Sequence, residues 1–436
     1  MRNTLIFAGN SCPALTGQIC ENLGMTTADA ELTQFSNGET SVRILTSVRE
    51  KDVFVVQSGS SNVNDSIMEL LIMISACKGG SANKITAVLP YFPYSRQSKK
   101  KSHRGAITAR MLANLLGVAG VKHVITVDLH ASQMQGFFKC PVDNLHAEPI
   151  IAKWIRHNVP NWREAVVVSK NAGGTKRVTS LADALKLNFG MVTTDRKRGT
   201  NMSASMIMNH LDGMAHPPAT TPPGLRSPTA DSETTLAGFD DRRAREVTHG
   251  RLVHGHIVED DFPSPTMSAG NSNEDDPMTM SHASSFFVQE GEPLGGSGDA
   301  VASSDEEDNA FHNPKVEHMI TLVGDVKNRT VLIVDDMIDK PGSWIAAAET
   351  VVKRGHAKRV YCIATHGVFG GDCLEQLQAC ECIDTIVVTN SFPIQEEAAR
   401  RCKKLVILDL SFLLAEAIRR NHYGESISPL FQHIGD

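Results

Sequence analysis

Two adjacent carboxylates, Asp335 and Asp336, stand between an apolar run and a glycine-containing turn, an arrangement that can hold a sugar phosphate. Residues 330–334 are β-branched or apolar and predict a buried parallel strand, and the residues after the turn have the apolar spacing of a helix. The turn is therefore expected at the carboxyl end of a strand, where open α/β sheets bind ligands and a helix start presents N–H groups to a phosphate. There the carboxylates can accept hydrogen bonds from ribose hydroxyls while Gly342 and Ser343 hold the phosphate. An acidic strand end can also be only a solvated turn.

Three further polar segments lie in predicted turns or at strand ends, and each has two interpretations. Residues 35–39 (Phe-Ser-Asn-Gly-Glu) precede a predicted strand and, taken alone, are typical of a polar turn. Residues 94–97 (Tyr-Ser-Arg-Gln) lead into the cationic residues 98–104, which can clamp a polyphosphate or form a solvated face. Asp128 and His130 stand two residues apart at a strand end, as expected for a metal–nucleotide site or for a histidine satisfied within a turn.

Strand-like and helix-like apolar spacing alternate along most of the chain, which predicts an α/β fold with parallel sheets flanked by helices. The predicted strands are residues 53–56, 85–89, 124–127, 166–168, 330–334, 360–365, 386–389 and 405–408. The clearest predicted helices are residues 67–77, 109–117 and 178–186. A chain of 436 residues is too long for one ordinary core and indicates more than one domain.

Residues 201–318 interrupt the alternation. They contain 20 acidic and 6 basic residues, a balance of −14, together with two proline pairs and an acidic run at 305–308. Such a segment cannot bury enough apolar surface to order itself, so we expect a disordered insertion. The predicted organisation is an N-terminal domain of residues 1–148 and a second domain formed by 149–200 and 319–436, with the insertion inside the second.

The rest of the chain carries 37 basic and 29 acidic residues, a balance of +8 that suits small anionic substrates. It contains neither the aromatic-interleaved basic stripe of a nucleic-acid-binding protein nor an apolar stretch of the 18 or so residues that span a bilayer, so we expect neither nucleic acid nor membrane as a partner. The nine cysteines are odd in number, and Cys380 and Cys382 lack the second pair of a zinc site. Free thiols in a cytoplasmic protein are the plainer expectation.

Seven segments together resemble the phosphoribosyl pyrophosphate (PRPP) synthetases in order and spacing, and the acidic loop also resembles that of type I phosphoribosyltransferases. The family motifs are Phe-Ser-x-Gly-Glu, Tyr-x-Arg-Gln, Val-Asp-Leu-His-Ala-x-Gln, Gln-Gly-Phe-Phe, Pro-Val-Asp-Asn, Ala-Thr-His-Gly and the acidic loop. In this chain they occupy residues 35–39, 94–97, 127–133, 135–138, 141–144, 364–367 and 335–343. The resemblance implies two type I phosphoribosyltransferase-like domains with parallel-rich sheets flanked by helices.

The resemblance also implies an activity, that of a ribose-phosphate diphosphokinase, which transfers the β,γ-diphosphoryl group of ATP to the anomeric hydroxyl of ribose 5-phosphate and yields PRPP and AMP. It assigns ATP to Phe35, Asn37, Glu39, Arg96 and Gln97. Ribose 5-phosphate is assigned to Asp335, Asp336, Asp339, Gly342 and Ser343. The implied cofactor Mg²⁺ is assigned to Asp128, His130 and Asp143. In such a transfer, positioning and cationic groups must carry most of the catalysis.

The chain departs from the family pattern where charge matters most. Residues 98–101 are Ser-Lys-Lys-Lys where the family has Asp-x-x-Asp, and Lys139 replaces another Asp. Lys170 and Asn171 stand in place of the family's Pro-Asp, and Lys340 replaces a Thr of the acidic loop. Each exchange of a carboxylate for a lysine changes the local charge by two units, so we expect weaker binding of a magnesium nucleotide.

The family's catalytic loop carries Lys-x-Arg, and these two positions align with Asp195 and Lys197 in this chain. A shift in register would let Arg196, Lys197 and Arg198 supply the catalytic charge. We therefore interpret the chain as a divergent PRPP synthetase subunit that depends on a hetero-oligomer with homologous subunits, resembling the insertion-bearing subunits of fungal synthetases. The alternative is a non-catalytic regulatory or scaffold subunit. A nucleic-acid-binding protein ranks third because it leaves the acidic loop unexplained.

Overall fold

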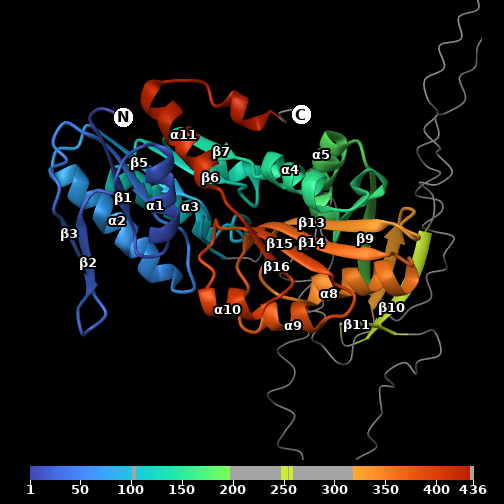
Figure 1. Cartoon of the computed structure of the whole chain (residues 1–436). Coiled ribbons are helices and arrows are strands. Elements are labelled where there is room, and N and C mark those ends of the chain that lie inside the picture. The colour runs from blue at the N-terminus through green and yellow to red at the C-terminus, as the bar shows by residue number, and fades with distance from the viewer. Residues whose placement is uncertain (101–104, 197–246, 254, 259–317, 433–436) are drawn as a thin grey trace, which may run out of the picture.

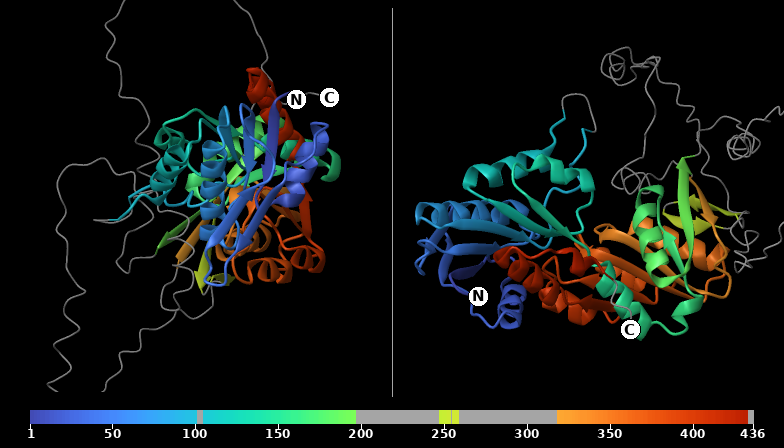
Figure 2. Two further views of the ribbon diagram at one scale, coloured as in Figure 1. Left: turned by 90° about the vertical axis from the view of Figure 1, so that its left-hand side faces the viewer. Right: turned by 90° about the horizontal axis from the view of Figure 1, so that it is seen from above.

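A computed structural model describes residues 1–100, 105–196, 247–253, 255–258 and 318–432 of the chain. Figures 1 and 2 show two lobes, each built around its own sheet. Both sheets are rich in parallel strands and are covered by helices, so the predicted α/β fold class is confirmed. Within these described ranges, no helix combines the length and apolar character needed to cross a bilayer.

The sheet of the N-terminal lobe has five parallel strands in the order β1-β4-β5-β6-β7. Their bounds are β1 Thr4–Ala8, β4 Asp52–Val56, β5 Lys84–Leu89, β6 His123–Val127 and β7 Val142–Leu145. The central strands are apolar at successive positions because helices cover both faces of the sheet. Helices α2 (Val63–Gly79) and α3 (Thr108–Ala119) pack on one face, and α1 (Pro13–Asn22) packs on the other.

A separate hairpin projects from this lobe (Figure 1). Its strands, β2 (Ala30–Gln34) and β3 (Thr40–Ile44), pair with each other in antiparallel register. The turn between them contains Gly38 at a φ of 87°, a left-handed conformation that glycine adopts without a steric cost. The predicted polar turn at residues 35–39 is thus the tip of a hairpin.

The second sheet has nine strands in the order β11-β10-β12-β9-β8-β13-β14-β15-β16. The strands from β9 to β16 in this order run parallel, and those from β11 to β9 run antiparallel. Their bounds are β8 Val166–Ser169, β9 Asn188–Arg196, β10 Val247–Val253, β11 His256–Val258, β12 His318–Val323, β13 Thr330–Ile338, β14 Arg359–Gly367, β15 Thr385–Thr389 and β16 Leu405–Leu408.

Helices cover both faces of the second sheet as well. They are α4 Glu148–Asn158, α5 Thr175–Leu185, α8 Gly342–Glu349, α9 Cys373–Ala379 and α10 Glu396–Arg401, and a π-helical turn at Thr350–Arg354 continues α8. The side of the sheet that carries α8 and α9 has its own apolar core, whose largest side chain is Trp344. The other side shares a continuous core with the N-terminal lobe.

The C-terminal helix α11 (Ser411–Tyr423) returns to the N-terminal lobe, although the sequence places it in the second domain. It packs against α1, and Asn22 donates a hydrogen bond of 2.9 Å to the Ser411 hydroxyl. Near the other end of α11, Lys84 of β5 donates a hydrogen bond of 2.9 Å to Asn421. The two lobes are therefore joined by a shared helix as well as by a shared core.

Two strands lie inside the segment that the sequence predicts to be a structureless insertion, and for residues 247–253 and 255–258 that prediction is wrong. β10 pairs with β12, and its Leu252 is 1% exposed. In β11, the Ile257 N–H donates a hydrogen bond of 2.8 Å to the Glu349 carboxylate. β10 forms because β12 offers it an edge, and β11 pairs in turn with β10. An average over the composition of residues 201–318 cannot reveal such pairing. The rest of that segment lies outside the described residues.

Candidate functional site

Asp335 and Asp336 lie near the carboxyl end of β13 and are buried, with 7% and 3% of their surface exposed. The strand is longer than predicted, because β13 continues past both residues to Ile338. The following loop leads into α8, so Gly342 and Ser343 open a helix as predicted. The strand, loop and helix start expected for a sugar-phosphate site are all present.

Three basic side chains surround this acidic pair. Lys170 Nζ lies 3.0 Å from an Asp335 carboxylate oxygen, and Arg177 lies 3.4 Å from Asp335 and 3.6 Å from Asp336. His130 Nδ1 lies 2.6 Å from Asp336. Burial alone would raise the pKa of Asp336, but Arg177 and His130 outweigh it and lower that pKa. Burial raises the pKa of Asp335 against the opposing charge of Lys170, so Asp336 is the more firmly ionised of the two.

Strand register brings Lys170 to the acidic pair. β8 and β13 are parallel neighbours with Ser169 opposite Val334. Lys170, the residue after β8, is therefore level with Asp335 of β13. The Lys170 side chain is 4% exposed. It also donates a hydrogen bond of 3.4 Å to the Ser343 hydroxyl, which links the acidic pair to the start of α8.

Asp128 lies in a left-handed conformation, with a φ of 42°, directly after β6. Its carboxylate accepts hydrogen bonds of 3.0 Å from the Ala147 N–H and 2.6 Å from the Thr365 hydroxyl of β14, and it lies 2.8 Å from His146 Nδ1. Burial raises the pKa of Asp128, but His146, Arg177 and Thr365 outweigh it and bring that pKa to about 2. This carboxylate therefore ties the N-terminal lobe to the second sheet.

The three side chains predicted to bind Mg²⁺ are not brought together. Asp128 is held by the contacts above, and His130 contacts Asp336. Asp143 pairs in β7 with Ile125, three residues before Asp128, and its carboxylate lies 2.8 Å from His123 Nε2. Residues 1–100, 105–196, 247–253, 255–258 and 318–432 contain no cluster of three or more His, Cys, Asp or Glu side chains that could hold a metal ion.

The described side chains near the acidic pair therefore form no ready-made cluster for a Mg²⁺ ion held by the protein alone. Mg²⁺ requires six oxygen ligands in near-octahedral geometry. The available carboxylates of Asp128, Asp335 and Asp336 already face cations or hydrogen-bond donors of the chain itself. A divalent ion beside Asp335 and Asp336 would be repelled by the charges of Lys170 and Arg177.

Arg96 and Asp339 form an ion pair between the loop after β5 and the loop after β13. The sequence assigns Arg96 to ATP and Asp339 to ribose 5-phosphate, so the structure brings the two predicted substrate sites into contact. Gly370 fits tightly beside this pair, because a Cβ atom at that position would lie 2.7 Å from an Asp339 carboxylate oxygen.

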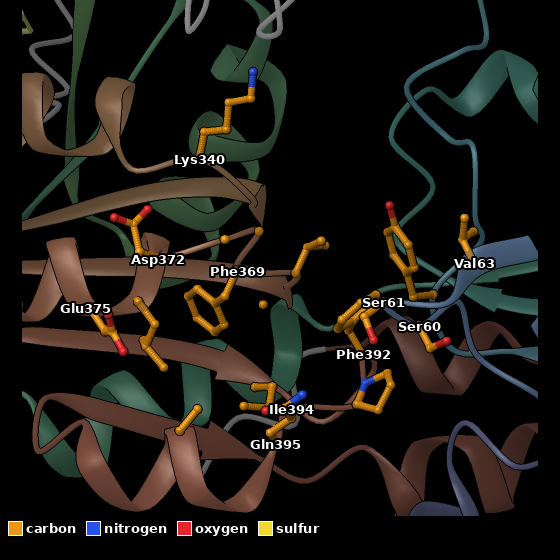
Figure 3. A pocket seen from close by; sticks show the side chains of 18 of the residues that line it. Ser60, Ser61, Val63, Lys340, Phe369, Asp372, Glu375, Phe392, Ile394 and Gln395 are labelled. Carbon is orange, nitrogen blue, oxygen red and sulfur yellow. The ribbon is translucent and has the colours of Figure 1, made fainter.

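A cavity of about 950 Å³ lies between the two lobes beside this ion pair. Figure 3 shows side chains from both lobes around it, with Ser60, Ser61 and Val63 on one side and Lys340 and Phe369 on the other. Its lining also includes Arg96 and Gln97, together with residues of α9 and α10. The cavity is large enough for a nucleotide-sized ligand.

Phe35, Asn37 and Glu39 do not line this cavity. They lie in the turn at the tip of the projecting β2–β3 hairpin, and Phe35 is 60% exposed. An aromatic side chain so exposed at a loop tip buries little apolar surface within its own chain. The structure thus separates these three predicted ATP ligands from Arg96 and Gln97.

The predicted catalytic cations cannot be placed as a group. Arg196 is the last residue of β9, where its backbone pairs with His318 of β12. Lys197 and Arg198 lie outside the described residues.

Arg177 is a site residue that the sequence analysis did not identify. It lies in the first turn of α5, close to both carboxylates of the acidic pair. A sequence signal exists, because the glycine-rich turn at residues 172–174 follows a predicted strand and precedes two basic residues. Such a turn at a strand end is typical of an anion-facing helix start.

Two family models match parts of the chain. Residues 4–120 match the family described as the N-terminal domain of ribose phosphate pyrophosphokinase, and residues 272–432 match the phosphoribosyl synthetase-associated domain. The chain is 49% identical to ribose-phosphate pyrophosphokinase 1 of Saccharomyces cerevisiae over 445 aligned positions, which cover 100% of this chain and 99% of the yeast protein. It is 51% identical to ribose-phosphate pyrophosphokinase 1 of Schizosaccharomyces pombe, with 99% of each chain covered.

A solved structure also resembles the chain. The crystal structure of phosphoribosylpyrophosphate synthetase from Mycobacterium smegmatis matches it with a TM-score of 0.65 and 28% sequence identity. The match covers 97% of this chain and 100% of the mycobacterial chain.

Proposed function

The chain belongs to the ribose-phosphate pyrophosphokinase family, and we propose that it is a subunit that transfers the β,γ-diphosphoryl group of ATP to the anomeric hydroxyl of ribose 5-phosphate. The products are PRPP, a precursor for nucleotide biosynthesis, and AMP. The observation that carries the proposal is the Arg96–Asp339 ion pair, because it joins the cavity to the acidic loop at the start of α8.

Ribose 5-phosphate binds where β13 meets α8. The carboxylates of Asp335 and Asp336 accept hydrogen bonds from the vicinal ribose hydroxyls. Asp339 lies in the loop that follows and completes this side of the site. The phosphate lies at the N-terminus of α8, where Gly342 and Ser343 offer N–H groups and a hydroxyl. The reacting anomeric hydroxyl then points toward the cavity.

ATP occupies the cavity, with Arg96 and Gln97 facing its phosphates. Phe35, Asn37 and Glu39 act in the cavity of a neighbouring subunit, which explains why they lie exposed at the tip of a projecting hairpin. The proposal therefore requires an oligomer. In a hetero-oligomer, a homologous subunit with a complete catalytic loop can bring that loop to the ribose site of this chain.

Mg²⁺ enters this proposal only as part of the ATP complex, because Lys170 and Arg177 already neutralise the carboxylates of Asp335 and Asp336. The residues of the chain itself bind and orient the two substrates. The nine thiols form no disulfide among the described residues, which supports a cytoplasmic location.

A second candidate function, a non-catalytic regulatory or scaffold subunit, is favoured by two departures from the family pattern. Lys170 and Asn171 replace the Pro-Asp of the resembling family directly beside the acidic pair, and Asp195 stands at the lysine position of the catalytic loop. Loss of one aligned cationic donor commonly reduces the rate by a factor of about a hundred or more. The lone chain is therefore expected to be slow or silent.

Measurement of AMP release separates the two functions. The assay compares the lone chain, a catalytically complete homologue alone and the mixture of both, each with ATP and ribose 5-phosphate. The Asp336→Asn variant of this chain is assayed in parallel, since it removes the more firmly ionised carboxylate of the ribose site. If the variant raises activity in the mixture as well as the unaltered chain does, this chain's own site is dispensable and the scaffold function is correct.

A further inference from the structure

The acidic pair of the ribose site is matched by cations of the chain itself. Asp335 and Asp336 face the ammonium group of Lys170 and the guanidinium group of Arg177, all within 3.0 to 3.6 Å. Two negative side chains thus meet two positive ones before any ligand arrives. His130 completes the group with its contact of 2.6 Å to Asp336.

Lys170 is built into this position. Its side chain is 4% exposed, and its Nζ lies 3.0 Å from Asp335 and 3.4 Å from the Ser343 hydroxyl. The ammonium group also lies 5.5 Å from the centre of the Trp344 ring, close enough for a cation–π interaction. A buried lysine retains its charge only when it is paired in this way. The cation therefore stands between the ribose-binding carboxylates and the start of α8.

We propose that Lys170 supplies the cation of the ribose site, so that this chain binds ribose 5-phosphate without Mg²⁺. The inference rests on the proposed function, because it concerns the same ligand at the same site. It makes Lys170 a specificity-determining residue of the ribose site. A metal ion is then required only for the binding of ATP.

Electrostatics supports the proposal. A divalent ion bound to Asp335 and Asp336 would stand among Lys170, Arg177 and His130, and every one of these contacts would have to break or become repulsive. A sugar phosphate meets no such conflict. Its hydroxyls can donate to carboxylate oxygens that still have acceptor capacity, and its phosphate is attracted by Lys170 from the α8 side.

Isothermal titration calorimetry of the full chain with ribose 5-phosphate alone, in EDTA and in excess MgCl2, tests the proposal. The two dissociation constants are expected to agree within about twofold. Binding that occurs only with MgCl2 would overturn the role of Lys170 but leave the proposed function intact. Absence of binding in both buffers would overturn both.

Two variants sharpen the test. Lys170→Met is expected to weaken binding in EDTA roughly tenfold or more, whereas Lys176→Met, an exposed lysine of α5, should leave it unchanged. In electron paramagnetic resonance titrations, the double variant Lys170→Pro/Asn171→Asp is expected to bind Mn²⁺ and the unaltered chain is expected not to bind it. Tight Mn²⁺ binding by the unaltered chain without nucleotide would contradict the proposal, even if a variant fails to fold.

Discussion

The guanidinium group of Arg96 and the carboxylate of Asp339 form an ion pair that links a loop of the N-terminal lobe to the acidic loop of the second sheet. Arg96 is a predicted ATP ligand and Asp339 a predicted ribose ligand. Their contact gives the two proposed substrate sites a common charged boundary, so we expect binding at one site to change the affinity at the other.

A double-mutant cycle on this pair tests the coupling. Arg96→Ala and Asp339→Asn should each weaken ATP binding, and the double variant should lose less than the sum by about 0.5–1 kcal/mol, since both side chains are partly exposed. Calorimetric titration with ATP measures the effect, and Arg110→Ala on the exposed face of α3 serves as the control. Strict additivity of the two changes would show that the pair does not couple the sites.

The second prediction concerns Asp336. Asp336→Asn should weaken ribose 5-phosphate binding by about 1.5–3 kcal/mol, the usual worth of a hydrogen bond to a charged group. It should also lower the free energy of unfolding, because Arg177 loses a buried partner 3.6 Å away. Titration calorimetry and urea unfolding measure the two effects, with Asp29→Asn at an exposed turn as the control. Unchanged ribose 5-phosphate affinity would place the ligand elsewhere.

The contact between His146 and Asp128 predicts a pH dependence of stability. The hydrogen bond to Asp128 raises the pKa of His146 above its ordinary value of 6.5. A raised folded-state pKa stabilises the fold fully below the unfolded value, and the contribution is lost as the pH rises through the folded value. The unfolding free energies of the unaltered chain and His146→Gln should therefore differ most below pH 6.5 and converge at alkaline pH.

Urea unfolding across this range measures the difference, and His157→Gln at an exposed position of α4 is the matched control. A difference that grows with increasing pH would contradict the assignment, because the sign of the linkage would be reversed.

The fourth prediction concerns the hairpin tip. Phe35→Ala should change the unfolding free energy by less than about 0.5 kcal/mol, because the side chain is 60% exposed. Loss of one aromatic stacking contact should nonetheless lower AMP release by the mixed complex several-fold. The rate should fall without a change in ribose 5-phosphate affinity. If the variant is as active as the unaltered chain in the mixture, the hairpin tip does not act in the site of a neighbouring subunit.

The fifth prediction tests the strand found inside the insertion. Leu252→Ala should destabilise the fold by about 2–5 kcal/mol, as expected for truncation of a buried leucine. Val247→Ala, at a position of the same strand that is 51% exposed, should cost far less. Thermal and urea unfolding measure both. Equal, negligible effects would mean that β10 contributes nothing to the second sheet.

The sequence by itself determined the acidic loop and the α/β alternation, because both depend on local patterns. The apolar run before Asp335, the glycine at 342 and the helical spacing after it specify a strand, a turn and a helix whatever surrounds them. The order and spacing of the motifs at residues 35–39, 94–97 and 127–133 likewise indicated the family.

Tertiary structure alone decided which side chains meet. Lys170 reaches Asp335 because the register of β8 against β13 makes them level, and 165 positions of sequence separate them. Register also holds Asp143 opposite Ile125, within strand β7 rather than beyond its carboxyl end, and there His123 is its partner. A sequence records which charges a chain carries, but pairing between distant strands decides which charge neutralises which. Here that pairing placed Lys170 beside Asp335, in the proposed ribose site.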